Sequence, residues 1–236
     1  LLEAIRFLKI KNVKFYQAST SELFGETYGK NIFNEKSKFH PKSPYGVAKL
    51  FSYWITSVYR ESYGIFASNG ILFNHESPRR GETFVTRKIT RFLARKKLGS
   101  KDTLYLGNLN AKRDWGHAKD YVEAMWKMLQ KKNPTDYVIA TGKQFTVKQF
   151  VNFVLKELNM KCKWKGKGFG SKCYFNKKCI VECDKEYYRP LEVDTLLGDS
   201  RKARRELNWK PKISIKKLVS EMVQSELKFL ETNFFR

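Results

Sequence analysis

Long apolar runs and paired cysteines are both missing from this sequence. No apolar stretch approaches the ~18–20 residues that cross a bilayer. The first 15 residues carry apolar side chains at helical spacing, with no small-residue cleavage site after them. We therefore expect a soluble cytoplasmic protein without a membrane segment or signal peptide. Cys162, Cys173, Cys179 and Cys183 lack the C-x-x-C pairs of a zinc ribbon, so we expect reduced thiols and no metal site.

Acidic residues are also scarce. The chain has only 23 Asp and Glu residues but 47 Lys and Arg residues, which gives a formal net charge of +24. The excess fits either lysines spread over solvated surfaces or a polyanionic partner, such as nucleic acid or a phosphorylated ligand. The basic residues are dispersed along the chain, and no zinc-finger, leucine-zipper or RNA-recognition signature accompanies them. Nucleic-acid binding is therefore the less favoured interpretation.

The sequence does have the composition and alternation of a globular α/β protein. Its 236 residues are 42% hydrophobic and 15% aromatic, enough for one large domain or a domain with a small lobe. Residues 13–19 and 66–74 are short, β-branched or aromatic segments typical of strands, and residues 45–63 between them have helical periodicity. A strand, a long helix and a second strand predict a parallel sheet with right-handed crossovers.

Three segments have an apolar face that we expect to pack inward as helices. The last of them begins with a predicted capping box of Thr146 and Gln149. The inward sets are Val47, Leu50, Phe51, Trp54, Ile55, Val58 and Tyr59 in residues 45–63; Val122, Met125, Trp126 and Leu129 in residues 119–130; and Val147, Phe150, Val151, Val154, Leu155 and Leu158 in residues 146–159.

The segment "SPYGVAKLFSYW" places Tyr45 and Lys49 four residues apart at the start of the first of these helices. Residues i and i+4 share a helix face, so the ammonium can favour the phenolate form of a tyrosine. Such a pair can act as the base that removes a proton from an alcohol. By itself it equally fits a helix start with a polar edge.

Polar residues follow both predicted strands at their carboxyl ends, where α/β proteins bind ligands. Thr20 and Glu22 follow the first strand: a hydroxyl there can bind a substrate oxygen, and a carboxylate there can take a carbon-bound proton beside a ketone. The alternative for these two residues is a capped turn. Asn74, His75 and the pair Arg79 and Arg80 follow the second strand, and paired arginines suit phosphate recognition.

Eight motifs along the chain belong together: "FYQASTSELFG", "HPKSPYGVAK", "NGILFNHESPRRG", "FVTRKI", "LGNLNAKRDWGHAKDYVEAMW", "YVIATG", "YYRPLEVDTLLGD" and "LNWKPKI". With them the sequence resembles the GDP-mannose 4,6-dehydratase family of extended short-chain dehydrogenases/reductases, over nearly the whole chain. The combination of "NHESPRRG" with "KRDWGHAKDYV" is the most specific part, since it separates this family from the sugar epimerases that share the fold.

The resemblance implies a lyase that uses NADP to convert GDP-mannose to GDP-4-keto-6-deoxymannose, the precursor of GDP-fucose and GDP-rhamnose. It implies that Tyr45 removes the proton of the sugar 4-hydroxyl and that Lys49 holds the nicotinamide ribose. Thr20 would bind the 4-oxygen. Glu22 would take the C5 proton and protonate the departing 6-hydroxyl, before hydride returns to C6.

The same resemblance implies ligand-binding residues and an assembly. The cofactor NADP would contact Tyr45, Lys49, His75 and Arg80. The complete protein would be a homo-oligomer, a dimer or a tetramer. The residues implied for GDP-mannose binding are Asn74, Val85, Lys88, Arg113, Arg189 and Glu192.

The sequence departs from the family in having no G-x-x-G-x-x-G strand–turn–helix to cradle a pyrophosphate. We therefore expect an N-terminally incomplete chain, short by roughly 100 residues or more at ~30 residues per βαβ unit. Residues 1–75 would be the remaining half of a Rossmann-like, doubly wound NADP-binding domain. Residues 76–236 would be mainly a smaller α/β substrate lobe, with segments returning to the sheet.

Such a chain is expected to fold poorly alone and not to bind NADP tightly, because its sheet has an exposed edge. Two alternatives to the dehydratase remain. One is a catalytically inactive remnant that serves as a substrate lobe or interaction module, and the other is another nucleotide-sugar dehydratase or epimerase of the same superfamily.

Overall fold

The computed structural model describes residues 1–25, 32–188 and 193–234 of the chain. The chain forms two compact units, and each unit is assembled from three separate segments of the sequence. Unit 1 consists of residues 1–75, 114–144 and 195–212, and unit 2 of residues 76–113, 145–194 and 213–236.

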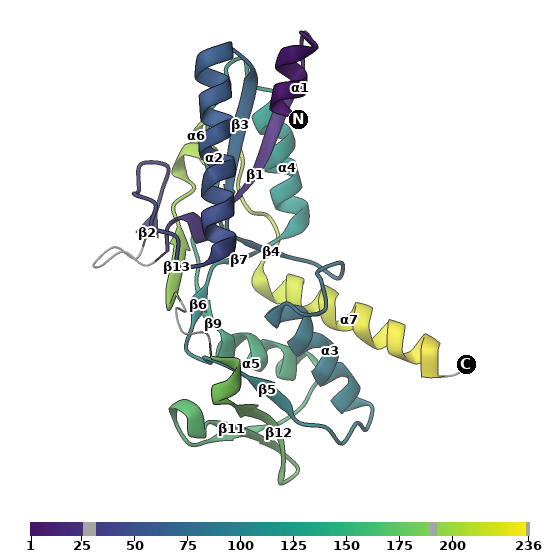
Figure 1. Ribbon diagram of the computed structural model, residues 1–236. Helices are drawn as coiled ribbons and strands as arrows, with labels where there is room; N and C mark the ends of the chain where they lie inside the picture. Colours follow the sequence, from purple (N-terminus) through teal and green to yellow (C-terminus); the bar gives the residue numbers. More distant parts are fainter. Residues whose placement is uncertain (26–31, 189–192, 235–236) are drawn as a thin grey trace. The chain divides into compact units, whose positions relative to one another are not determined.

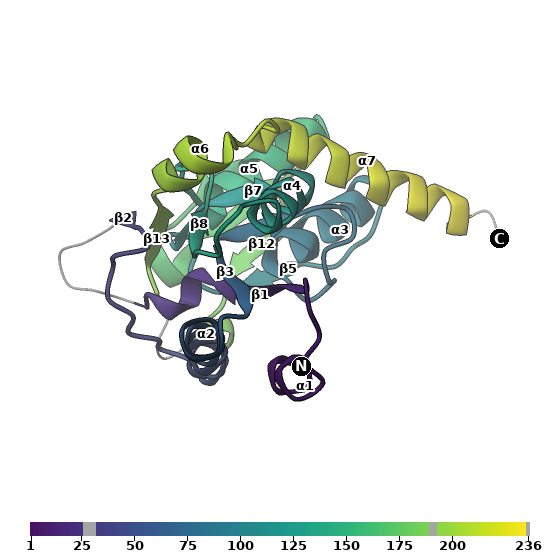
Figure 2. The same cartoon turned by 90° about the horizontal axis from the view of Figure 1, so that it is seen from above.

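Unit 1 is built on a parallel sheet of β1 (Lys14–Thr20), β3 (Phe66–Leu72) and β8 (Tyr137–Ile139), in the order β1-β3-β8. Thr20 of β1 lies opposite Leu72 of β3, so both strands end at the same edge. Parallel strands need helical crossovers that cover both faces. Here α2 (Pro44–Tyr63) and α4 (Ala118–Leu129) lie on opposite faces of the sheet (Figure 2). The predicted α/β class with a doubly wound parallel sheet is confirmed.

The boundaries of α2 follow from its local sequence. Ser43 is the N-cap, and its hydroxyl accepts a hydrogen bond from the backbone N–H of Gly46. Pro44 occupies the first turn, where its missing N–H has no helical partner to lose. The helix ends at Gly64, whose φ of 64° is left-handed and favours glycine. The helix predicted for residues 45–63 is therefore present.

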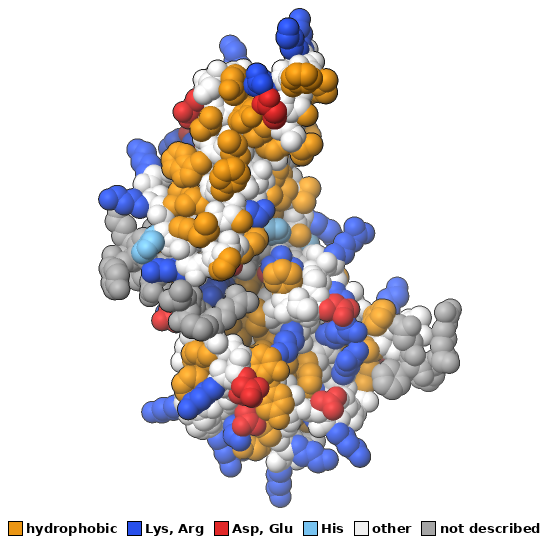
Figure 3. All heavy atoms as spheres, in the orientation of Figure 1, with side chains coloured by type: hydrophobic (Ala, Val, Ile, Leu, Met, Phe, Trp, Pro, Cys, Tyr) orange, Lys and Arg blue, Asp and Glu red, His pale blue; other side chains and the backbone are white. Residues whose placement is uncertain are grey.

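The predicted packing of α2 is wrong. Four of the seven side chains predicted to face inward, Val47, Phe51, Trp54 and Val58, are exposed, and the other three are only partly buried. Apolar atoms gather over this helix in the upper part of the surface in Figure 3. The residues buried against the sheet are instead small or polar: Gly46, Tyr53, Thr56 and Ser57.

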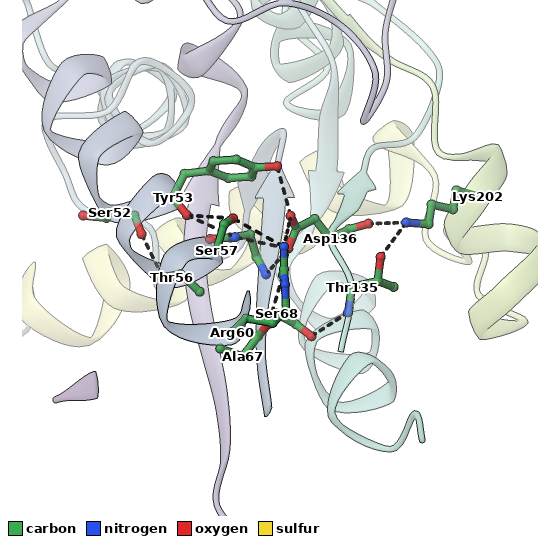
Figure 4. Close-up of polar contacts among 11 residues, drawn as sticks. Ser52, Tyr53, Thr56, Ser57, Arg60, Ala67, Ser68, Thr135, Asp136 and Lys202 are labelled. Atoms are coloured by element: carbon green, nitrogen blue, oxygen red, sulfur yellow. Dashed lines mark hydrogen bonds and ion pairs between the residues drawn. The ribbon is translucent and has the colours of Figure 1, made fainter. Parts of the chain in front are cut away.

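The polar inner side of α2 is explained by a buried carboxylate, Asp136, just before β8 (Figure 4). Its oxygens accept hydrogen bonds from the Tyr53 hydroxyl at 2.9 Å and the Asn69 backbone N–H at 2.9 Å. They also form an ion pair with Arg60 at 2.7 Å. A buried charge requires such partners, so α2 supplies polar groups to the sheet and its apolar side faces outward.

The inward face predicted for α4 is also wrong in part. Val122 and Trp126 are exposed, whereas Tyr121, Ala124 and Met128 are fully buried. These three belong to a core cluster with residues of β3, β8 and α6 (Arg201–Leu207). The α4 helix is therefore rotated by about one residue from the predicted orientation.

Unit 1 contains further short elements around this sheet. Phe33 and Phe24 stack with ring centroids 4.9 Å apart and close one end of the core. The remaining elements are α1 (Leu2–Phe7), the 3-10 helix η1 (Ser21–Leu23), β2 (Ile32–Phe33), β7 (Trp115–His117) and β13 (Thr195–Gly198); β4 (Asn74–Glu76) continues into unit 2.

Unit 2 combines a sheet with α-helices (Figure 1). The sheet has the order β10-β11-β12-β5, with β12 parallel to β5 and the other neighbours antiparallel. One strand of this sheet, β5, precedes α5 (Val147–Glu157) in the chain, and the other three follow it. Their bounds are β5 (Leu104–Leu106), β10 (Lys163–Lys165), β11 (Lys172–Phe175) and β12 (Lys178–Cys183).

The α5 helix of unit 2 buries the core residues that its periodicity predicts. In α5, the capping box of Thr146 and Gln149 and the inward face are confirmed. The α3 helix packs on α7, and Arg87 forms a buried ion pair with Glu226. The other elements are α3 (Val85–Lys97), α7 (Ile215–Phe234), the pair β6 (Lys112–Arg113) and β9 (Phe145–Thr146), η2 (Gly168–Gly170) and η3 (Lys185–Tyr187).

Among the described residues, no helix has the length and hydropathy needed to cross a membrane. Likewise, no group of three or more His, Cys, Asp or Glu side chains in the described ranges could hold a metal ion.

Candidate functional site

The first part of the site is the turn in which β1 ends. Thr20 is the last residue of β1 and the N-cap of η1. Its Oγ1 accepts a hydrogen bond from the backbone N–H of Glu22 at 3.3 Å. This turn places the Thr20 hydroxyl and the partly buried Glu22 carboxylate at the carboxyl edge of the sheet.

Ser43 joins the Glu22 carboxylate to the beginning of α2. Its Oγ donates to Oε2 of Glu22 at 2.9 Å and accepts from the backbone N–H of Gly46 at 3.0 Å. The approach is close: a Cβ at Gly46 would lie 3.1 Å from the backbone oxygen of Glu22 and 2.9 Å from Cβ of Pro41. Glycine at position 46 therefore allows the helix start to lie against η1.

Tyr45 and Lys49 lie one turn apart at this start of α2. The Lys49 ammonium donates to the carbonyl oxygen of Ala18 on β1 at 2.9 Å, and it lies 5.8 Å from the centre of the Tyr45 ring. The Tyr45 side chain is 52% exposed. The lysine is thus held between strand and helix, while the phenol remains accessible to a ligand.

His75 and Asn74 follow β3 at the same edge. The His75 ring donates through Nδ1 to the carbonyl oxygen of Phe73 at 3.0 Å and stacks on Tyr121, with ring centroids 5.0 Å apart. Thr20, Glu22, Tyr45, Lys49, Asn74 and His75 all belong to unit 1. The structure therefore brings together a phenol with its ammonium and a carboxylate with two hydroxyls, a set able to move protons at two positions of a ligand.

The other predicted binding residues belong to unit 2. The Arg80 guanidinium pairs with Glu76 at 3.2 Å and lies 3.7 Å from the centre of the Phe84 ring. Glu76 is buried and also accepts from the Thr86 hydroxyl at 2.5 Å. Burial raises the pKa of Glu76, although Arg80 and Thr86 oppose this.

Lys88 and Arg113 both contact backbone carbonyls of unit 2. Lys88 donates to the carbonyl oxygen of Tyr105 at 2.8 Å and lies 4.2 Å from the centre of the Tyr187 ring. Burial lowers the pKa of Lys88. Arg113 donates to the carbonyl oxygen of Lys112 at 2.9 Å. Val85 is the first residue of α3, and Arg189 and Glu192 lie outside the described residues.

Two serines at this edge are not among the predicted site residues. Ser43 had a readable signal, since a serine directly before proline is typical of a helix N-cap, but its bond to Glu22 depends on the fold. Ser19 had the same signal as Thr20 and Glu22, because it is one of the polar residues at the carboxyl end of the first predicted strand. Its hydroxyl is buried beside Thr20 and has no hydrogen-bond partner within the part of the chain that the structure describes.

Comparison with known sequences assigns this chain to a family. Residues 1–222 match the family model described as GDP-mannose 4,6 dehydratase. The chain is 53% identical to the GDP-mannose 4,6-dehydratase of Vibrio cholerae serotype O1, over 96% of this chain and 64% of that protein. It is 53% identical to the Dictyostelium discoideum protein (98% and 65%) and 51% identical to the Drosophila melanogaster protein (99% and 60%). The chain thus spans less than two thirds of these curated relatives.

Solved structures share the fold at low sequence identity. A dTDP-glucose 4,6-dehydratase from Bacillus anthracis in complex with NAD has a TM-score of 0.78 at 22% identity, covering 98% of this chain and 66% of that one. A UDP-glucose 4-epimerase from Thermotoga maritima with UDP-glucose has a TM-score of 0.79 at 24% identity, covering 98% and 68%. RMD from Pseudomonas aeruginosa complexed with NADPH has a TM-score of 0.79 at 18% identity, covering 96% and 71%.

Proposed function

Because the chain belongs to the GDP-mannose 4,6-dehydratase family, we propose that it carries the acid/base residues that convert GDP-mannose to GDP-4-keto-6-deoxymannose with NADP. The observation that supports this most directly is the joining of Glu22 to the start of α2 through Ser43. One edge of one sheet then carries both proton-transfer groups that the reaction requires. The chain spans 64% of the Vibrio cholerae relative. We therefore propose the complete reaction for a protein that also has the part of the relative that this chain does not match.

The residues at this edge fit the ribose–nicotinamide end of a dinucleotide. The buried Ser19 hydroxyl has no partner among the described residues, and the Lys49 ammonium is fixed nearby on Ala18. Lys49 would hold the nicotinamide ribose, while His75 and Arg80 would contact other parts of NADP. The chemistry that a bound NADP supplies is reversible hydride exchange with the sugar. No glycine-rich phosphate cradle occurs in the sequence itself.

Tyr45 would act on the sugar alcohol. Tyr45, one helical turn from Lys49, would remove the proton of the 4-hydroxyl during oxidation at C4. Thr20 would donate a hydrogen bond to the 4-oxygen. Its Oγ1 accepts from the backbone N–H of Glu22, so the hydroxyl hydrogen remains available for that oxygen.

Glu22 would act on the adjacent carbons. A ketone at C4 makes the C5 proton acidic, and the carboxylate would remove it and then protonate the departing 6-hydroxyl. A bound nicotinamide cofactor would supply the hydride for C6 and would not be consumed overall. Six residues would bind GDP-mannose: Asn74, Val85, Lys88, Arg113, Arg189 and Glu192. The active protein would be a homo-oligomer, a dimer or a tetramer.

The test uses the chain by itself and the chain joined to the part of the Vibrio cholerae relative that it does not match. With NADP and GDP-mannose, we expect the joined protein to form the 4-keto-6-deoxy product. Tyr45→Phe should abolish turnover and spare GDP-mannose binding. Glu22→Gln should stop after C4 oxidation, with the absorbance of reduced cofactor retained.

Two results would contradict the assignment. Normal turnover by Glu22→Gln would remove the C5 role from Glu22. No turnover by the joined protein, with GDP-mannose still bound, would favour an inactive substrate-binding remnant.

A further inference from the structure

The two hydrogen bonds of Ser43 do more than a helix cap requires. An N-cap hydroxyl needs only to accept from a backbone N–H of the first turn, and Ser43 does so with Gly46 at 3.0 Å. Its second bond, 2.9 Å long, runs to Oε2 of Glu22, 21 residues earlier in the chain. The capped end of α2 is therefore attached to the carboxylate at the end of β1.

The direction of these bonds follows from the number of hydrogens. A serine hydroxyl has one hydrogen, and the bond with Gly46 does not use it because the backbone N–H is the donor. That hydrogen is therefore directed at Glu22, and Oε2 must accept it. Of the two carboxylate oxygens, Oε1 is left to take up and release a proton.

Resting on the proposed function, we propose that Ser43 is a positioning residue for Glu22, which fixes Oε2 as a permanent acceptor and presents Oε1 as the atom that exchanges the proton with the substrate. Thr20 fixes the same residue from the other side, because its Oγ1 accepts from the Glu22 backbone N–H. Backbone and side chain of Glu22 are thus each held by one hydroxyl. The carboxyl group is oriented before a substrate binds, and such pre-orientation lowers the barrier to proton transfer.

The first test needs no turnover. Urea unfolding of the joined protein described above is measured for Glu22→Ala, Ser43→Ala and the double variant. Each substitution is expected to increase the unfolding equilibrium constant. If the two side chains interact, the increase in the double variant should be smaller, by about three- to tenfold, than the product of the increases in the two single variants. Ser43→Thr retains the hydroxyl and should keep the coupling.

Thr146→Ala is the matched control, because it removes an N-cap hydroxyl from α5 in unit 2. When Thr146→Ala is combined with Glu22→Ala, the increase in the unfolding equilibrium constant should equal the product of the two single increases to within about twofold. Independent effects of Glu22→Ala and Ser43→Ala would overturn the proposal.

The second test separates positioning from simple capping, using the joined protein described above. Tyr45 lies two residues after Ser43, so a general disturbance of the helix start would slow both C4 oxidation and C5 proton exchange. Loss of positioning should instead slow exchange of the C5 hydrogen with deuterated water by about tenfold or more. Formation of reduced cofactor in a single turnover should change much less, and Ser43→Thr should restore the exchange rate.

If Ser43→Ala slowed C4 oxidation and C5 proton exchange equally, Ser43 would act only as a helix cap, and the proposal would be overturned. The failure of the proposed function would look different. In that case the unsubstituted joined protein would form no reduced cofactor, and the unfolding cycle would still decide whether Ser43 holds Glu22.

Discussion

The helices α2 and α5 have apolar faces of similar regularity, yet they use them in opposite ways. In α5, Phe150 and Val154 are fully buried in unit 2. In α2, Phe51 and Trp54 are exposed, and the polar side of the helix packs on the sheet of unit 1. Periodicity identifies a face in both helices, but it does not decide whether that face meets the core of the same chain.

The difference lies in what each helix meets. The α5 helix packs on other helices of unit 2 through aliphatic and aromatic side chains. The α2 helix meets Asp136, whose buried charge needs hydrogen-bond donors, and Tyr53 and Arg60 supply them. A buried carboxylate at the start of a strand can thus reverse the orientation that hydrophobicity alone predicts.

The largest expected effect comes from truncating the same residue type on the two helices. Phe150→Ala should lower the free energy of unfolding by about 3–5 kcal/mol, because it empties a fully buried site. Phe51→Ala should change it by only about 0.5 kcal/mol or less, because Phe51 is 69% exposed. Both are measured by urea unfolding followed by circular dichroism. Equal losses at the two positions would show that the outer side of α2 is packed after all.

An intermediate effect is expected from Asp136→Asn, which keeps the shape of the side chain and removes its charge. Burial by itself would raise the pKa of Asp136, but the hydrogen bonds from Arg60, Asn69 and Tyr53 outweigh it, so the pKa lies below its ordinary value. The variant should lose about 1–3 kcal/mol at neutral pH, because charged hydrogen bonds are lost.

The pH dependence of this loss has a defined sign. A carboxyl whose pKa is lowered in the folded state stabilises the fold above the unfolded value of ~3.9. As the pH falls toward the folded value, the unfolded chain takes up a proton first and the stabilisation disappears. The difference in unfolding free energy between the two proteins should therefore shrink below about pH 4. A difference that stays constant from pH 7 to pH 3 would contradict the role of the charge.

Much of the fold could be predicted because its signals are local. The cap at Ser43, the stop at Gly64 and the capping box at Thr146 depend on residues within a few positions. The inner face of α2 could not be predicted, since the partner Asp136 is 76 residues away from Arg60. Pairing of distant polar groups leaves no periodic pattern in either segment.

In the candidate site, too, local signals could be predicted and contacts between distant segments could not. Tyr45 and Lys49 were visible as a spacing of four residues, and Thr20 and Glu22 as polar residues after a strand. The bonds that hold them, Lys49 to Ala18 and Ser43 to Glu22, connect β1 with α2. Sequence reasoning identified the chemical groups, whereas their orientation arises only from the packing of the helix start on the sheet edge.

The smallest expected effect tests the corrected orientation of α4. Trp126 was predicted to face inward, but its side chain is 62% exposed, whereas Met128 two residues later is fully buried. Trp126→Ala should therefore change the free energy of unfolding by no more than about 0.5 kcal/mol, although it removes the largest side chain of the helix. Met128→Ala, the matched control, should cost about 2–5 kcal/mol because it opens a cavity in the cluster with Tyr121. Urea unfolding is followed by circular dichroism, because the variant changes the tryptophan fluorescence. The reverse order of these two losses would restore the face that periodicity predicts and contradict the rotation of α4.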